Sequence, residues 1–309
     1  MPELPEVETV KNGLESALIG AVISGVTLRR SNLRTPFPKN FEKTLTGRKI
    51  TAIKRRAKYL LFYFDNAKSL PDIVLIAHLG MTGRFSVKSP SLRGGVADKA
   101  IQKKSRLKKD GLLPATPTVR SRNDELGVHD HVIFDFNDGR QLIYNDPRRF
   151  GLMELCKRQE LEQHKLFVHL APEPLEEKFT PAYLQKSLSK RETPIKPTIM
   201  DQKIVVGVGN IYANEALFMA GISPLKPANT IGKKIPELIS CIHSVLNDAI
   251  KAGGSTLKDF AHVSGESGYF QHNFHVYGRE GKACSKCKTA IISIRQAGRA
   301  TFYCPKCQK

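Results

Sequence analysis

The first residues of the chain have the types that a covalent reaction at an aldehyde-level carbon requires. We expect Met1 to be removed because residue 2 is small, which leaves Pro2 as a free secondary amine. An α-amino group has a reference pKa of roughly 7.7 to 8.0, so an appreciable neutral fraction exists near pH 7, whereas a lysine at roughly 10.4 is almost fully charged. The iminium that a secondary amine forms has no N–H to lose and stays cationic. Glu3 follows directly, where a proton donor is needed.

A second group with readable chemistry lies at the C-terminus. Two Cys-x2-Cys units are separated by 16 residues: Cys284, Cys287, Cys304 and Cys307. This spacing is typical of structural zinc sites, in which four thiolates occupy all four positions of a tetrahedron. We therefore expect one structural Zn²⁺ that folds a module too short to bury a core of its own. Redox chemistry or disulfides are the alternative, and they suit a cytosolic chain less well.

The segment between the cysteine pairs indicates a β-hairpin. Residues 291–294 and 301–303 are the two expected strands, with Arg295 and Arg299 near the turn. Hairpin arginines are often only solvated, but in a strongly basic chain we favour contact with phosphate. The C-terminal module is therefore expected to be a zinc ribbon.

The element that must carry Pro2 and Glu3 is a helix. Pro5 suits a first-turn position, and Glu6 and Glu8 lie favourably near the positive end of a helix. Apolar residues follow at helical spacing up to the stop at Gly20: Val7, Val10, Leu14 and Leu18. The helix would bury one face and hold Pro2 and Glu3 at its head. The alternative is an ordinary acidic helix start with no chemistry.

The next part of the chain is mainly β. Short apolar runs bounded by turn residues predict strands at 22–28, 50–53, 59–64, 73–79, 131–136, 141–144 and 152–156. Asn137, Asp138 and Gly139 form a good hairpin turn. We expect a β-sandwich or flattened barrel carrying the N-terminal helix. Residues 87–126 lack periodicity and are rich in Lys and Arg, so we expect a basic, disordered insertion whose role stays open.

The remainder is helical. Helical spacing covers 161–170, 182–188, 210–220 and 236–252. Before the third of these, Gly207 and Gly209 make a turn in which Asn210 is the expected N-cap, and the free N–H groups there suit a phosphate. The predicted domains are a catalytic β domain at 1–157, a helical domain at 158–273 and the ribbon at 274–309. This is an α+β chain.

Composition indicates a polyanionic partner. The formal net charge is +20, with 49 Lys and Arg residues, and nucleic acid is the leading candidate. Ribosome-type binding, a membrane surface or plain solvation would give the same charge. No apolar run approaches a membrane span, and the acidic N-terminus is unlike a secretory signal, so we expect a cytoplasmic protein without membrane contact. Cys156 and Cys241 are expected to be core thiols.

Several stretches in the same order along the chain resemble the formamidopyrimidine-DNA glycosylases. They are Pro2–Val10, Arg55–Tyr59, His78–Gly83, Asp146–Gly151, Gly207–Tyr212 and Arg299–Cys304. The resemblance implies a β-sandwich with an N-terminal helix, a helix-two-turns-helix domain and a zinc ribbon. Leu4 separates the chain from the similar endonuclease VIII branch, which has Gly there and prefers oxidised pyrimidines. The long insertion and Glu266, in the segment 263–268 that covers the flipped base in relatives, depart from the family pattern.

The resemblance implies a reaction and a role for each catalytic residue. Pro2 would form a Schiff base at C1′ of an oxidised purine nucleotide, such as 8-oxoguanine or a formamidopyrimidine, and Glu3 would protonate the sugar ring. Lys58 would assist the elimination beside the nucleophile, and Arg299 would act on the phosphate in the later elimination. The activities implied are base excision and β,δ-elimination at the abasic site.

The resemblance also implies how damaged double-stranded DNA is held. Met81 and Phe150 would fill the gap left by the flipped base, and Arg148 would bind the unpaired partner base. Phosphate-positioning residues would be His78, His129, Arg191 and Asn210. His129 and His131 could instead both bind a metal ion, but the sequence offers no clear third ligand.

We expect a monomer with no nucleotide cofactor that acts on nucleoid DNA. A competing hypothesis is a non-catalytic zinc-ribbon protein that binds or bends DNA. An RNA-directed, ribosome-associated protein has only the charge in its favour. Covalent trapping of the Schiff base separates an enzyme from either.

Overall fold

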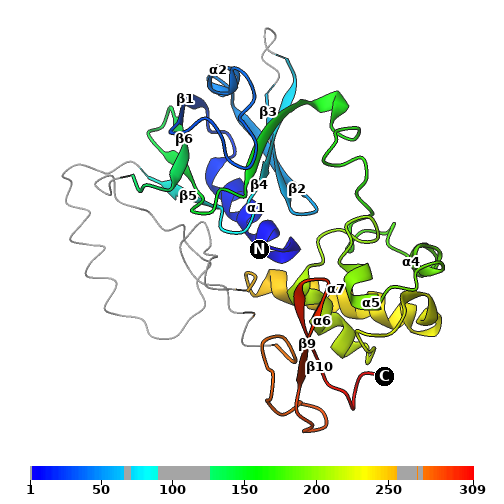
Figure 1. Ribbon diagram of the computed structural model, residues 1–309. Helices are drawn as coiled ribbons and strands as arrows, with labels where there is room; N and C mark the ends of the chain where they lie inside the picture. The colour runs from blue at the N-terminus through cyan, green and yellow to red at the C-terminus, as the bar shows by residue number, and fades with distance from the viewer. Residues whose placement is uncertain (1, 66–70, 90–125, 256–269, 271–273) are drawn as a thin grey trace.

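A computed structural model of the chain describes residues 2–65, 71–89, 126–255, 270 and 274–309 (Figure 1). Helix α1 (Leu4–Leu18) opens the chain and is followed by a β-rich half, a helical half and a small C-terminal hairpin. Among the described residues, no helix is both long and apolar enough to cross a membrane. The α+β class predicted from the sequence is confirmed.

The β-rich half is a sandwich of two antiparallel sheets. One sheet has the order β2-β3-β4-β8 and the other β1-β6-β7-β5. The strands are β1 (Ile23–Leu28), β2 (Ile50–Arg56), β3 (Tyr59–Phe64), β4 (Ile73–His78), β5 (Arg84–Lys88), β6 (Asp130–Phe136), β7 (Gln141–Asn145) and β8 (Leu152–Lys157). A short helix, α2 (Phe41–Leu45), packs against β1.

Helix α1 fills the sandwich with the predicted face. Val7, Val10, Leu14 and Leu18 are fully buried and belong to the same core as the inward residues of both sheets. The N-terminal end of α1 points toward the helical half (Figure 1), where the Leu4 N–H donates to the Gly207 carbonyl at 3.1 Å. The head of α1 therefore lies at the junction of the two halves.

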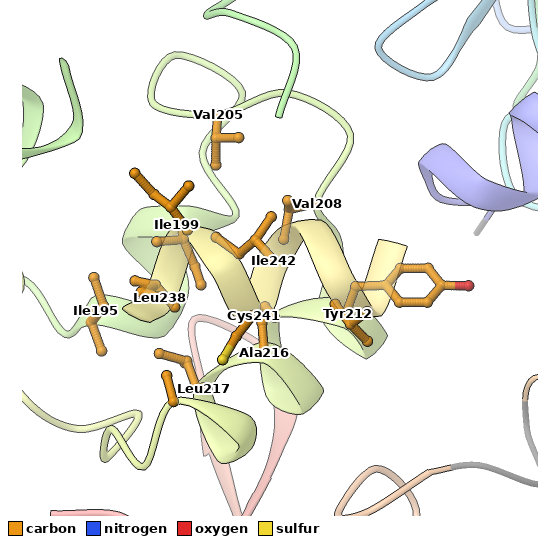
Figure 2. Close-up of a cluster of buried hydrophobic side chains, with 14 of the residues drawn as sticks. Ile195, Ile199, Val205, Val208, Tyr212, Ala216, Leu217, Leu238, Cys241 and Ile242 are labelled. Carbon is orange, nitrogen blue, oxygen red and sulfur yellow. The ribbon is translucent and has the colours of Figure 1, made fainter. Parts of the chain in front are cut away.

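The helical half packs around one long helix. It contains α4 (Pro181–Leu188), α5 (Ile195–Ile199), α6 (Asn210–Met219) and α7 (Ile235–Lys251), with short 3₁₀ turns at 158–160, 228–230 and 232–234. Figure 2 shows Leu238, Cys241 and Ile242 of α7 among the side chains of α5 and α6. Cys241 is buried, as is Cys156, so both are core thiols as predicted.

The C-terminal hairpin pairs β9 (Ile292–Gln296) with β10 (Arg299–Tyr303). Its two-residue turn is Ala297-Gly298, and both residues have positive φ, 46° and 76°. Such turns match the twist of the strands they connect. The hairpin is attached to α6, because the Phe302 N–H donates to Asn214 Oδ1 at 2.7 Å.

Three local predictions were wrong. Residues 161–170 form turns instead of a helix, because their apolar side chains pack on the outer face of β3 and β4 beside Val74 and Ile76. Asn210 is the first residue of α6 and Gly209 is its N-cap, since the Asn210 Oδ1 accepts a hydrogen bond from the Lys196 ammonium at 2.6 Å.

The third concerns the start of the basic insertion. Val87 and Lys88 belong to β5, a strand that the sequence did not predict, and they pair with Leu142 and Gln141. The predicted disorder falls on residues 90–125, which lie outside the described part of the chain.

Candidate active site

Glu3 lies buried against the first turn of α6. Its carboxylate accepts hydrogen bonds from the Ile211 N–H (Oε1, 3.0 Å) and the Tyr212 N–H (Oε2, 3.5 Å), and Pro2 beside it is also buried. The group that occupies the positive end of α6 is therefore the Glu3 carboxyl. The sequence interpretation had assigned this position to a phosphate.

The two glycines before α6 admit the head of α1. A Cβ on Gly209 would lie 2.2 Å from Glu3 Cδ, and one on Gly207 would lie 2.5 Å from Leu4 Cδ1. Gly207 also has φ +79°, which disfavours any side chain. The turn thus allows Leu4 and Glu3 to pack closely against the helical half.

Glu3 and Lys58 have pKa values shifted toward their neutral forms. Burial raises the pKa of the Glu3 carboxyl, while the Lys58 charge lowers it and the Glu6 charge raises it. Burial lowers the pKa of Lys58, while Glu3 raises it and Arg299 lowers it. A raised pKa favours the protonated carboxyl, which is the form that a general acid needs, and such shifts are common at active sites.

Glu6 fixes the peptide that carries Glu3. Its Oε2 accepts from the Glu3 N–H at 2.9 Å, which is a capping interaction. Its Oε1 accepts from the Tyr212 hydroxyl at 2.5 Å and from Ser255, N–H at 2.8 Å and hydroxyl at 2.9 Å. One buried carboxylate thus joins α1, α6 and the segment after α7. The sequence analysis had assigned Glu6 only to the helix dipole.

The turn that carries Lys58 is held by Glu173, which sequence reasoning missed. The Glu173 carboxylate is 4% exposed and accepts from the Ala57 N–H at 2.6 Å, from Arg55 at 2.6 Å and from Arg56 at 2.9 Å. Ala57 has φ +53°, an unusual value for a residue with a side chain. Because Glu173 follows the sandwich in sequence, it ties the Lys58 turn to the connection into the helical half.

Lys196 of α5 is a second residue that the sequence analysis missed. Its ammonium donates to Asn210 Oδ1 (2.6 Å), the Ala300 carbonyl (3.0 Å) and Thr301 Oγ1 (2.7 Å), so it joins α5, α6 and the ribbon. Burial and, to a smaller extent, the Arg299 charge lower its pKa to about 8, while the Glu3 charge acts in the opposite direction. No motif or spacing in the sequence distinguishes Lys196 from the many other lysines of this basic chain.

The exposed Arg299 lies at the ribbon tip, and its charge lowers the pKa of both buried lysines, Lys58 and Lys196. A cavity of about 230 Å³ is lined by Lys196, Arg299, Asp201 and Gln296, among others. An adjoining hollow shares Asp201 and Gln296 and is also lined by Arg191. Arg191 and Arg299 therefore line two adjoining hollows between the helical half and the ribbon.

Four other predicted DNA contacts, Met81, His129, Arg148 and Phe150, lie on loops of the sandwich. Met81 is half-buried, whereas Phe150 is 44% exposed and has the Arg148 guanidinium 4.8 Å from its ring centre. His129 is exposed, with its ring centre 6.3 Å from that of His131. Among the described residues, neither histidine belongs to a group of three or more possible metal ligands, so the metal pair has no support.

His78 is a neutral hydrogen-bond donor. Burial, followed by the charges of Lys58 and Arg34, lowers its pKa to about 4. Its Nδ1 lies 2.9 Å from the Gly80 nitrogen, whose N–H it accepts. The single proton of the neutral ring must therefore be on Nε2.

The four cysteines of the ribbon form a site for one metal ion. Their Sγ atoms all lie within 4.8 Å of one another, with Cys284 and Cys307 3.9 Å apart and Cys287 and Cys304 3.4 Å apart. Zn–S bonds of about 2.3 Å require sulfurs about 3.8 Å apart in a tetrahedron. The sulfurs fit this geometry, and the predicted structural zinc site is confirmed.

Comparisons with known proteins agree with this architecture. Three family models match in order: the formamidopyrimidine-DNA glycosylase N-terminal domain (residues 1–153), its H2TH domain (170–261) and the zinc finger found in FPG and IleRS (281–309). The formamidopyrimidine-DNA glycosylase of Dinoroseobacter shibae is 43% identical over 312 residues, and the match covers 100% of both chains. This chain belongs to the formamidopyrimidine-DNA glycosylase family.

Solved structures of the family include DNA complexes. A Lactococcus lactis FPG mutant bound to Fapy-dG containing DNA matches with TM-score 0.81 and 34% identity, covering 100% of each chain. The same organism's Fpg with an abasic site containing DNA matches with TM-score 0.81 and 33% identity, covering 99% of each chain. The segment 263–268, expected to cover the flipped base, lies outside the described residues here.

Proposed function

We propose that this protein is a bifunctional DNA glycosylase and abasic-site lyase of base excision repair, acting on oxidised purines such as 8-oxoguanine and formamidopyrimidines. The observation that carries the proposal is the buried Glu3 carboxyl beside Pro2, with its pKa raised by burial. A free Pro2 amine would be a nucleophile next to an acid. Relatives solved with Fapy-dG and abasic DNA support both halves of the proposal.

The reaction begins when the Pro2 nitrogen bonds to C1′ and Glu3 gives a proton to the sugar ring. The glycosidic bond breaks and the base leaves with the bonding electrons. Pro2 then loses its N–H proton and the C1′–O4′ bond breaks onto the oxygen that Glu3 protonates, which leaves an iminium between Pro2 and C1′ of the opened sugar. The cationic iminium acidifies the adjacent carbon, so loss of its proton expels the 3′ phosphate. Lys58 assists this elimination, and Arg299 stabilises the phosphate that leaves in the second one. Hydrolysis of the iminium frees Pro2.

Residues on the sandwich and on the helical half would hold the damaged duplex while a base is flipped. Met81 and Phe150 fill the space in the stack, and Arg148 binds the unpaired base. His78, His129, Arg191 and Asn210 position phosphates. We assign the catalytic domain to 1–157, the helix-two-turns-helix domain to 158–273 and the ribbon to 274–309, in a monomer that acts on nucleoid DNA in the cytoplasm without a nucleotide cofactor.

Borohydride trapping tests the proposal. Reduction of the iminium converts it to a stable amine, so the full-length protein should become covalently joined to duplex DNA containing 8-oxoguanine. A matched undamaged duplex should give no adduct. Absence of an adduct, together with tight binding to both duplexes, would indicate the non-catalytic zinc-ribbon protein instead.

A further inference from the structure

We infer that Asp146 is a positioning residue that joins the two wedge loops, residues 79–83 and 146–151, into one rigid body through Thr82. The inference rests on the proposed function, because it explains how Met81 and Phe150 would enter the base stack together. It assigns to two buried residues a role in base extraction that is separate from the chemical steps.

Asp146 is fully buried, and its carboxylate is bonded from both loops. Oδ1 accepts the Thr82 hydroxyl at 2.6 Å, and Oδ2 accepts the Gly151 N–H at 2.9 Å. The Tyr144 hydroxyl donates to Oδ2 at 3.3 Å. A buried carboxylate needs several such donors, and removal of one leaves a costly unpaired group. The three donors come from the first loop, the second loop and β7.

Thr82 completes the connection by bonding back to the second loop. Its hydroxyl oxygen accepts the Arg148 N–H at 3.2 Å while its proton goes to Asp146. The position of Arg148 is thus set by a residue one place after Met81. The backbone of Asp146 adds a third loop: its N–H donates to the His129 carbonyl at 3.0 Å, and its carbonyl lies 2.9 Å from His131 Nε2.

Glycines let the two loops touch directly. A Cβ on Gly80 would lie 2.3 Å from the Phe150 carbonyl carbon, and Gly80 has φ +64°. A Cβ on Gly151 would lie 1.8 Å from the Tyr144 hydroxyl oxygen. Because the backbones are in contact and share a buried carboxylate, the loops cannot move apart without breaking several bonds. Met81 and Phe150 therefore keep a fixed separation as DNA binds.

The test uses Thr82→Val, which keeps the side-chain shape and removes the hydroxyl, with Thr82→Ser as the conservative partner. Single-turnover rates are measured on a duplex with 8-oxoguanine and on the same duplex with a preformed abasic site. Thr82→Val should lower the first rate about tenfold, equivalent to about 1.4 kcal/mol, and the second by less than about twofold. Thr82→Ser should restore the first rate to within about twofold of the parent protein.

A matched control is Thr46→Val, because Thr46 is an exposed threonine whose hydroxyl bonds only a local carbonyl, that of Glu42 at 2.9 Å. It should leave both rates unchanged. Asp146→Asn, which keeps the volume, supplies a second variant with the same expected selectivity. A 2-aminopurine base beside the lesion should show slower unstacking with Thr82→Val.

Equal losses on the two substrates, or no loss on either, would overturn the positioning role. A fall in melting temperature with equal rate losses would mean that Asp146 and Thr82 only stabilise the sandwich. Failure of the proposed function is distinguishable, since the parent protein would then process neither substrate.

Discussion

The residues proposed to perform chemistry and those proposed to hold DNA differ in how the fold positions them. Glu3 and Lys58 are buried, have shifted pKa values and are fixed by groups from both halves of the chain. Arg148, Phe150 and Arg191 are exposed and lie on loops or helix ends. Burial tunes proton affinity, whereas exposure leaves side chains free to meet a large polyanion.

Arg299 belongs to both groups. It is exposed on the ribbon tip, yet its charge lowers the pKa of Lys58 and Lys196. Its position depends on the zinc module and on the bonds from Lys196 to Ala300 and Thr301. Substitutions in the buried group should therefore affect the chemical steps, those in the exposed group should affect DNA binding or base extraction, and loss of zinc should affect both chemistry and binding.

The largest effect should follow from removing the nucleophile or the acid. Retention of Met1 or an N-terminal tag turns Pro2 into an amide, which has no nucleophilic lone pair, so strand cleavage should be abolished while duplex binding persists. Glu3→Gln should likewise lose base excision and keep binding. Gel assays of cleavage and binding on one preparation measure both. Normal turnover by a verified N-terminally extended protein would refute the role of Pro2.

Removal of zinc should have the next largest effect. The ribbon core is small and includes Cys284 and Cys304 themselves, so it should unfold without metal, whereas the sandwich has its own core. Chelation should abolish DNA binding before it melts the sandwich, as followed by binding and by circular dichroism. Metal analysis should return one zinc per chain. Unchanged affinity of Cys304→Ser would contradict this.

Truncation of the wedges should have a smaller and selective effect. Met81→Ala or Phe150→Ala should lower excision from a damaged duplex much more than cleavage at a preformed abasic site, which has no damaged base to extract. If these were core residues, stability would fall by about 2 to 5 kcal/mol and both rates would fall together. Phe150 at 44% exposure argues against a core role. Melting temperatures measured with both rates decide between the two.

The sequence predicted those features that are encoded locally. Strand β3 was predicted with its observed bounds, 59–64, because turn residues flank a continuous apolar run. The zinc ligands were readable from their spacing alone. Helix α1 followed from its apolar period and from Pro5.

The contacts that position the site could not be predicted in this way. Glu173 bonds Ala57 across 116 residues, and Glu3 bonds Ile211 across 208. No local pattern encodes such pairs, because they depend on how two separately folded halves meet. Residues 161–170 show that a local pattern can also mislead. Their apolar spacing is typical of a helix, but they form turns whose apolar side chains pack against a sheet.

Substitutions of a neutral and of a charged phosphate contact should have modest and different effects on DNA binding. His78 is neutral near pH 7 since its pKa is about 4, so it would bind phosphate without releasing a counterion. His78→Gln should weaken binding without changing the salt dependence of log K, whereas Arg191→Ala should reduce that slope by about one. Titrations at several salt concentrations measure both slopes. A lower slope for His78→Gln would show that this histidine is charged when bound.

The smallest effect should be a pH dependence of binding that arises from Lys196. Its pKa is about 8, so its charge is lost between pH 7 and 9, next to the cavity that it shares with Arg299. Loss of one positive charge should weaken affinity for undamaged duplex a few-fold, on the order of 1 kcal/mol or less.

Loss of folded protein does not explain a fall in DNA affinity with rising pH. A lysine whose pKa is lowered by folding from 10.5 to about 8 destabilises the fold while it is charged, so its contribution to stability rises with pH across that interval. A fall in affinity over the same interval therefore reports the charge beside this cavity and not loss of structure. Lys196→Arg keeps the charge at both pH values. It should remove the pH step, and a step that persists in this variant would assign the titration to another group.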